Sequence, residues 1–212
     1  MKSAVLLLAL AAAPASAQIP YTPTFTTPGE RFFSLHLGLA QPTGTSGLSS
    51  VAGKGPSVGI EYFSFLNDWF ALGAAIDMHV LGTGADAGPP ARTGSAGYKG
   101  LSVLGRVNFL RELSWTPYVV GGAGYGLGDV SVSCAGPGCG TAASTAKSAL
   151  GPSVTLGVGL DSFLSPAVSW GAEARVSQFK LPAAAVTFPA PSRTGQALAF
   201  RLFLRYWLGP KT

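Results

Sequence analysis

The sequence predicts an all-β protein, an eight-stranded antiparallel up-and-down β-barrel that spans a membrane. Three observations predict this fold. Only 11% of the residues are charged while 47% are hydrophobic, whereas about a quarter are charged in typical globular proteins. The chain also divides into segments of about ten residues, the length that a tilted transmembrane strand needs. Finally, the charges inside these segments fall on one face of each strand.

The first residues indicate export. A positive start at Lys2 precedes an apolar run over residues 4–13, and a small-residue site ends at Ala17. This order is typical of a secretory signal peptide, so we expect residues 1–17 to be removed by cleavage between Ala17 and Gln18. The apolar run is too short to be a membrane anchor. Three prolines in the next segment predict an extended periplasmic leader over residues 18–30.

Each predicted strand is an apolar or alternating segment bounded by turn residues. In chain order, the strands cover residues 31–41, 56–65, 69–80, 98–110, 116–128, 149–163, 167–179 and 195–208. Short connections at 67–68, 111–115 and 165–166 alternate with long ones at 41–55, 81–97, 129–148 and 180–194. Outer-membrane barrels show this alternation of short periplasmic turns and longer external loops. We therefore predict the barrel over residues 31–208 and a short tail over 209–212.

Side-chain alternation is the strongest evidence, because successive residues of a strand point to opposite faces. In segment 195–208, the positions from Leu198 to Leu208 that share one face are all large and apolar, and the other face carries two arginines. The charges that lie well inside predicted strands all take the polar face: Glu61, Asp77, Arg106, Asp161, Glu173, Arg175, Arg201 and Arg205. Arg31 and Lys99 take the other face, at predicted strand ends where lipid headgroups solvate them.

Two other classes of protein are alternatives to the barrel. A helical membrane protein fits poorly, because the mature chain has no stretch of about 20 consecutive strongly apolar residues. A periplasmic β-sandwich or lipocalin-like barrel would also alternate, so alternation alone leaves it open. The low charge, the export signal and the alternating loop lengths together favour lipid on the apolar face.

Aromatic residues gather near the predicted short-turn ends of the strands. They are Trp69, Phe70, Trp115, Tyr118, Phe163, Trp170, Tyr206 and Trp207. Their amphipathic rings suit the headgroup level, so we expect them to form a periplasmic interfacial girdle.

Residues 67–73 (Asn-Asp-Trp-Phe-Ala-Leu-Gly) and 116–124 (Thr-Pro-Tyr-Val-Val-Gly-Gly-Ala-Gly) resemble small outer-membrane β-barrel proteins of the OmpA/OmpX/opacity type. The resemblance covers residues 31–208 and implies an outer-membrane location and recognition by the barrel-assembly machinery. The chain departs from the family in two ways. No peptidoglycan-binding domain follows the barrel, and Trp207 is followed by residues 208–212 where related barrels often end on an aromatic residue.

The interior charges indicate what the barrel does. An eight-stranded barrel is just wide enough for side chains to fill its interior. Four of the predicted interior charges are acidic and four are basic, and Glu173 should face Arg201 across neighbouring strands. We therefore expect a plug of paired charges and a structural or surface-interaction role. The alternative is a narrow ion-conducting pore that opens when the pairs rearrange.

A lipid-modifying outer-membrane enzyme is a further alternative. His36 and His79 both take the interior face, with Ser34 and Asp77 two residues away on the same face. A nucleophile, a base and an orienting acid need mutual hydrogen-bond reach. No specific catalytic motif accompanies these residues. We therefore predict no catalytic residues, no cofactor and no metal site.

The external loops are the remaining candidates for function, because loops on a rigid scaffold commonly carry recognition. Cys134 and Cys139 flank a Gly-Pro-containing turn, and in an exported protein we expect them to form a disulfide rather than stay free thiols. The loop over 129–148 would then contact a surface ligand of unknown identity. The net charge of +5 is scattered, which argues against nucleic acid as a partner. We expect a monomer surrounded by outer-membrane lipid.

Overall fold

The computed structural model describes residues 28–43, 48–86, 91–109, 115–135, 144–182 and 194–208. The predicted signal peptide and its cleavage site, most of the leader, the tail and Cys139 lie outside these ranges. The domain boundaries at the two ends of the chain and the disulfide with Cys134 therefore stay predictions.

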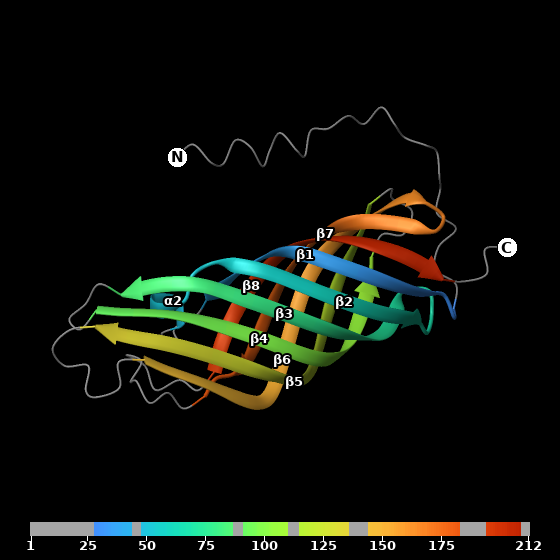
Figure 1. Cartoon of the computed structure of the whole chain (residues 1–212). Helices are drawn as coiled ribbons and strands as arrows, with labels where there is room; N and C mark the ends of the chain where they lie inside the picture. Colours follow the sequence, from blue (N-terminus) through green and yellow to red (C-terminus); the bar gives the residue numbers. More distant parts are fainter. Residues whose placement is uncertain are drawn as a thin grey trace, which may run out of the picture.

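Eight antiparallel strands close into a barrel, as predicted (Figure 1). They are β1 (Arg31–Thr43), β2 (Gly55–Phe65), β3 (Phe70–Asp86), β4 (Ala91–Asn108), β5 (Trp115–Ala135), β6 (Ser144–Ser165), β7 (Val168–Lys180) and β8 (Thr194–Leu208). Each strand pairs with its neighbour along the chain, and β8 pairs with β1. Within the closed part of the barrel no sheet edge remains, so the strands satisfy their backbone hydrogen bonds among themselves, which the bilayer interior requires.

The outer surface of the barrel is apolar and open. Large side chains point away from the interior all round the wall, for example Ile76, Val103 and Leu202, which are 61%, 61% and 64% exposed. Soluble monomers rarely expose contiguous apolar patches of more than a few hundred Å². A sandwich or a lipocalin-like barrel would bury this face. Lipid is therefore the solvent that fits the outer surface.

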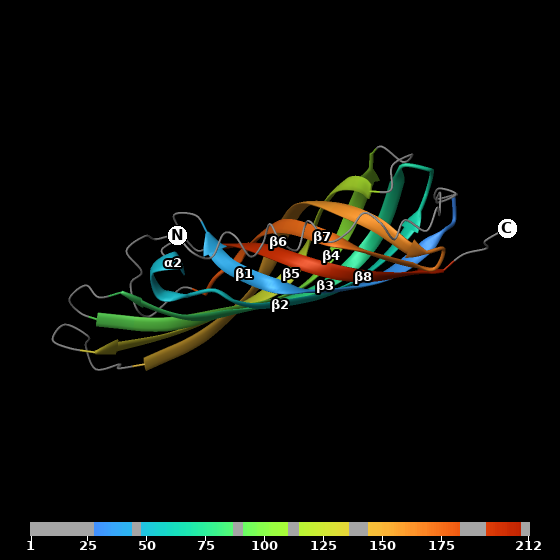
Figure 2. The ribbon, with the colours of Figure 1, turned by 90° about the horizontal axis from the view of Figure 1, so that it is seen from above.

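Four strands, β3 to β6, are much longer than the sequence predicts. The expected loops at 81–97 and 129–148 are wrong for most of their length, because β3 continues to Asp86 and β4 begins at Ala91, while β5 reaches Ala135 and β6 begins at Ser144. Backbone pairing continues here, as between Ser95 and Ser131. These residues lie beyond the lipid, so their outward side chains need not be large and apolar. The sequence pattern that marks a strand therefore ends here, although the backbone pairing continues. Figures 1 and 2 show β3 to β6 running past the mouth of the barrel.

This extension also moves Lys99 away from its expected place at a strand end. Lys99 lies well inside β4 with its side chain exposed. It directly follows the outward apolar positions Leu101 and Val103 toward the outer rim. The membrane boundary, not the end of the strand, therefore marks where a charge is tolerated on the outer face.

A short helix, α2 (Leu48–Val51), lies at the same mouth (Figures 1 and 2). The segment after it is tied to β3, because Ala52 forms a bridge with Thr83 and the Gly53 N–H donates to the Gly82 carbonyl at 2.7 Å. Leu48 is fully buried and so anchors the helix in the mouth. No helix in the described ranges has the length and apolar character to cross a membrane.

The predicted aromatic girdle is partly wrong. Trp69, Trp115 and Tyr206 point outward and are 53%, 45% and 55% exposed, as an interfacial girdle requires. Tyr118 and Trp207 are buried inside the barrel instead, and Phe163 packs against the same interior cluster. Tyr118 shares the inward face of β5 with the buried residues Thr116 and Val120, and Trp207 shares that of Arg205 on β8. Strand alternation therefore overrides the preference of an aromatic ring for the interface.

Candidate functional site

The barrel interior is the candidate site, and buried side chains of the described residues line it along its length. All eight predicted interior charges lie there, each at most 4% exposed. They form two groups. The central cluster contains Glu61, Asp77, Glu173, Arg175 and Arg201, and the periplasmic cluster contains Arg106, Asp161 and Arg205. Buried charges of this kind persist only when they are paired and hydrogen-bonded, because each costs several kcal/mol to remove from water.

Arg175 is the hub of the central cluster. From β7 it donates to Glu61 of β2 in a short hydrogen bond, to Asp77 of β3 at 3.3 Å and to Glu173 at 2.9 Å. Arg201 of β8 donates to Glu173 at 2.6 Å and also to Asp77. Glu173 and Arg201 are register partners in β7 and β8, which confirms their predicted pairing. The cluster thus joins four strands across the lumen.

The central cluster also needs a close backbone approach at Gly59 of β2. A Cβ atom at this position would lie 2.5 Å from Asp77 Oδ1 and 2.7 Å from Arg201 Nη1. Glycine is therefore the residue that leaves room for this ion pair.

His36 joins the cluster in a way that does not suit catalysis. Its Nε2 lies 3.1 Å from Glu61 Oε2 and 3.0 Å from Ser34 Oγ. A relay needs the nucleophile on one ring nitrogen and the orienting acid on the other, whereas here both partners contact the same nitrogen. His79 contacts Ser57 through Nδ1 at 2.9 Å. Both histidines are fully enclosed, so within the described residues neither presents a nucleophile to lipid.

The oxygen and nitrogen atoms of His36, Glu61 and Glu173 that could bind a metal lie within 4.8 Å of one another. A cation does not fit between them, because the Arg175 guanidinium already bonds to both carboxylates. A divalent ion would have to displace this buried positive charge. We therefore interpret the three residues as part of the ion-pair cluster.

The periplasmic cluster holds two arginines with one carboxylate. Arg106 donates to Asp161 Oδ2 at 3.0 Å, and Arg205 bonds to the same oxygen. Aromatic faces offset the remaining positive charge: the Arg106 Cζ atom lies 3.6 Å from the centroid of the Tyr118 ring, and the Arg205 Cζ atom lies 4.3 Å from that of Phe32. Cation–π contacts of this kind strengthen where water is excluded.

Apolar side chains pack across the interior on both sides of the central cluster. Toward the periplasm, Phe32, Phe63, Phe65, Leu104, Tyr118, Phe203 and Trp207 pack together. Toward the outside, Leu48, Leu81, Tyr98, Val130, Phe179 and Leu181 form a second group. Tyr98 stacks on Phe179 with ring centroids 4.6 Å apart, and Leu48 belongs to α2. The described residues therefore form three successive layers across the lumen.

Sequence reasoning missed the aromatic layer, although a signal for it was present. Phe63 and Phe65 share the strand face of Glu61, and Phe203 shares that of Arg201. Extending the alternation from each charge toward the periplasmic end predicts all three as interior residues. The contacts between particular charges depend on the shear of the barrel, and the sequence alone does not show that.

The outer membrane protein beta-barrel domain is the family whose model matches this sequence, over residues 3–194. The chain belongs to this family. Its members' location and its fold place it in the bacterial outer membrane. No curated protein matches the sequence significantly.

Solved structures share the fold at low identity. Neisserial surface protein A has a TM-score of 0.57 and is 15% identical, with 84% of this chain and 98% of that chain covered. The attachment invasion locus protein of Yersinia pestis has a TM-score of 0.51 and is 12% identical, with 85% and 99% covered. At these identities the likeness shows the fold, and the small-barrel resemblance in the sequence is confirmed.

Asp161 provides a direct test of the buried ion pairs. Replacing Asp161 with Leu leaves Arg106 and Arg205 buried without a carboxylate, so we expect the free energy of unfolding in urea to fall by about 3–5 kcal/mol. A triple variant, Asp161→Leu with Arg106→Met and Arg205→Met, should recover most of this loss, because a buried ion set replaced by apolar groups is often neutral. A triple variant less stable than the single one would contradict pairing as the reason for these charges.

Proposed function

We propose that the protein is a non-conducting outer-membrane barrel that holds a projecting β-sheet wall at the cell surface for contact with an external partner. The filled lumen carries the first part of this proposal. The extension of β3 to β6 beyond the apolar band carries the second.

The three interior layers support a closed barrel rather than a pore. An ion crossing the lumen would have to pass two apolar layers and a cluster in which Arg175 and Arg201 are held by three carboxylates. A gate would require all three layers to rearrange together. An eight-stranded barrel leaves no spare width beside them.

The projecting wall supports a role at the surface. β3, β4, β5 and β6 have 17, 18, 21 and 22 residues, against 13 for β1 and 11 for β2. A groove of about 510 Å³ lies on this wall, and its outward-facing lining combines Val80, Gly97 and Ala146 with the polar residues Ser95, Lys99, Asp129, Ser131 and Ser148. Hydroxyl and charged groups on a rigid scaffold suit a polar partner. The fold is also used by a protein named for attachment and invasion.

Planar-bilayer recording tests whether the barrel is closed. We expect the refolded protein to give no stable single-channel steps under conditions in which a general porin conducts. A Tyr98→Ala, Phe179→Ala variant should stay silent too, because the charge layer and the periplasmic aromatic layer still close the lumen. Reproducible steps from the unmodified protein, abolished on its heat denaturation, would contradict the proposal and favour the pore.

An array of immobilised glycans and matrix proteins tests the surface role. We expect the fluorescently labelled barrel to bind a subset of polar spots, and a Lys99→Gln, Asp129→Asn variant to lose that binding because the polar wall groove is altered. Lys54→Gln is the matched control, since Lys54 is exposed but lies outside this groove. Binding that is equal in all three proteins, or absent in all, would contradict contact through the wall.

A further inference from the structure

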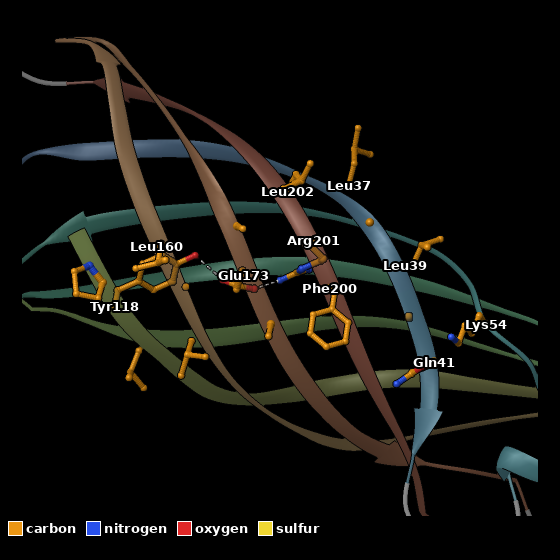
Figure 3. Close-up of a pocket in the computed structure, with 18 of the residues that line it drawn as sticks. Leu37, Leu39, Gln41, Lys54, Tyr118, Leu160, Glu173, Phe200, Arg201 and Leu202 are labelled. Carbon is orange, nitrogen blue, oxygen red and sulfur yellow. Dashed lines mark hydrogen bonds and ion pairs between the residues drawn. The ribbon is translucent and has the colours of Figure 1, made fainter. Parts of the chain in front are cut away.

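A groove of about 1150 Å³ crosses the lipid-facing side of the barrel. Figure 3 shows its lining, which comes mainly from β5, β6, β7, β8 and β1. It is almost entirely apolar and is distinct from the filled interior. Fluid lipid is enough to cover most of the outer surface. This part differs because it is hollowed into a groove.

The strand register explains the shape of the groove. One wall is a row of paired outward residues that includes Leu160, Ala172 and Leu202. The opposite wall is the row two residues further along each strand, with Val158, Ala174 and Phe200. On β7 the residue in each wall is an alanine, whereas the partners on β6 and β8 have larger side chains. The small alanine side chains leave the groove open at its middle.

The floor lies between these two rows. Gly159, Glu173 and Arg201 are the register partners there. The side chains of Glu173 and Arg201 are buried in the central cluster, so these residues meet the groove with their backbone. The same register row therefore holds an ion pair inside the barrel and the floor of an apolar groove outside it.

The two ends of the groove differ in charge and lie toward opposite sides of the membrane. Phe109, next to the periplasmic end of β4, lines one end. Gln41 and Lys54, next to the outer ends of β1 and β2, line the other. Because the strands of such barrels are tilted by about 35–45°, a path across them runs obliquely from one membrane surface to the other. The exposed Lys54 ammonium group lies at the outer headgroup level.

The width of the groove selects its occupant. Its walls are two residues apart along a strand, which corresponds to about 7 Å. A transmembrane helix, with a diameter of about 10–12 Å, cannot enter it. A second barrel would meet it with an equally ridged wall and leave it unfilled. A single extended hydrocarbon chain is the membrane component that is narrow enough.

We propose that this groove binds one acyl chain of an anionic lipid of the outer leaflet, with the headgroup phosphate against Lys54. Lipid tails are as apolar as the groove, so burial from water does not favour the bound lipid over its neighbours. Selectivity therefore comes from packing of the chain against Ala172 and Ala174 and from the charge of Lys54. The groove fixes the depth and direction of the chain, and the lysine fixes the class of headgroup.

Native mass spectrometry with defined lipids tests this proposal. The protein, folded in detergent, is mixed with equal amounts of palmitoyl-oleoyl phosphatidylglycerol and phosphatidylcholine, and the retained lipid is counted. We expect a preference of roughly fivefold for phosphatidylglycerol, the size that one lysine near a headgroup provides. Lys54→Gln should bring the ratio close to one, and Ala172→Leu with Ala174→Leu should remove retention of both lipids.

Two matched variants distinguish the groove from general lipid contact. Lys180→Gln removes another exposed lysine, at the outer end of β7, and Ala74→Leu enlarges a lipid-facing alanine on β3. Neither residue lines the groove. Both should behave like the unmodified protein, and heat-modifiable gel mobility checks that every variant is folded. The proposal is overturned if filling the groove leaves lipid retention unchanged, or if Lys180→Gln lowers the preference as much as Lys54→Gln does. Because Lys54→Gln leaves the interior untouched, its result decides the headgroup part by itself.

Discussion

Arg175 meets three carboxylates in the middle of the barrel, and much of the remaining structure follows from that contact. A guanidinium group taken out of water is tolerated only with good partners on several sides. Glu61, Asp77 and Glu173 supply them from β2, β3 and β7. These strands are not all neighbours, so the contact exists only when the barrel is closed in this register. Closure and charge pairing therefore require each other.

The two faces of the barrel wall have different surroundings. The outer face is apolar and interacts with lipid, whereas the inner face carries every charge that the membrane cannot accept. Arg205 shows how tightly the inner face is packed, because its guanidinium lies over Phe32 and Phe203 while it bonds to Asp161. A closed lumen, as proposed above, leaves the outer surfaces as the places where the protein can interact. One is the projecting wall of β3 to β6, and another is the oblique groove across β5 to β1.

Much of this architecture could be predicted from the sequence because strand alternation is a local property. The charge of Asp77 or Arg205 identifies the inner face of its strand. Because successive residues alternate between the two faces, the face of every other residue in that strand follows. The ends of the strands could not be predicted in the same way. Around Ser95 and Ser131 the backbone ladder continues in water, where side-chain hydrophobicity no longer reports it. Loop length was therefore overestimated.

The site was predictable in its members but not in its contacts. Alternation places Glu61 and Arg175 on the inner face of strands far apart in the sequence, and only the shear of the barrel brings them together. The one predicted pair, Glu173 with Arg201, lies on adjacent strands joined by a single connection, so its register could be counted from the sequence. For Tyr118 and Trp207 the two signals disagree, because the residue type predicts the membrane interface and the strand face predicts the interior. The strand face gives the correct position.

Exchange of the arginine guanidinium protons, followed by NMR of the folded barrel in lipid nanodiscs, tests the closed, charge-paired interior most directly. Arg31, which is exposed at the start of β1, serves as an internal reference. If the interior is closed, the N–H signals of Arg175 and Arg201 will persist in heavy water long after that of Arg31 has disappeared, and they will show contacts to the carboxylates of Glu173 and Asp77. Loss of all three signals at the same rate would show that water reaches the lumen, and would contradict the closed barrel.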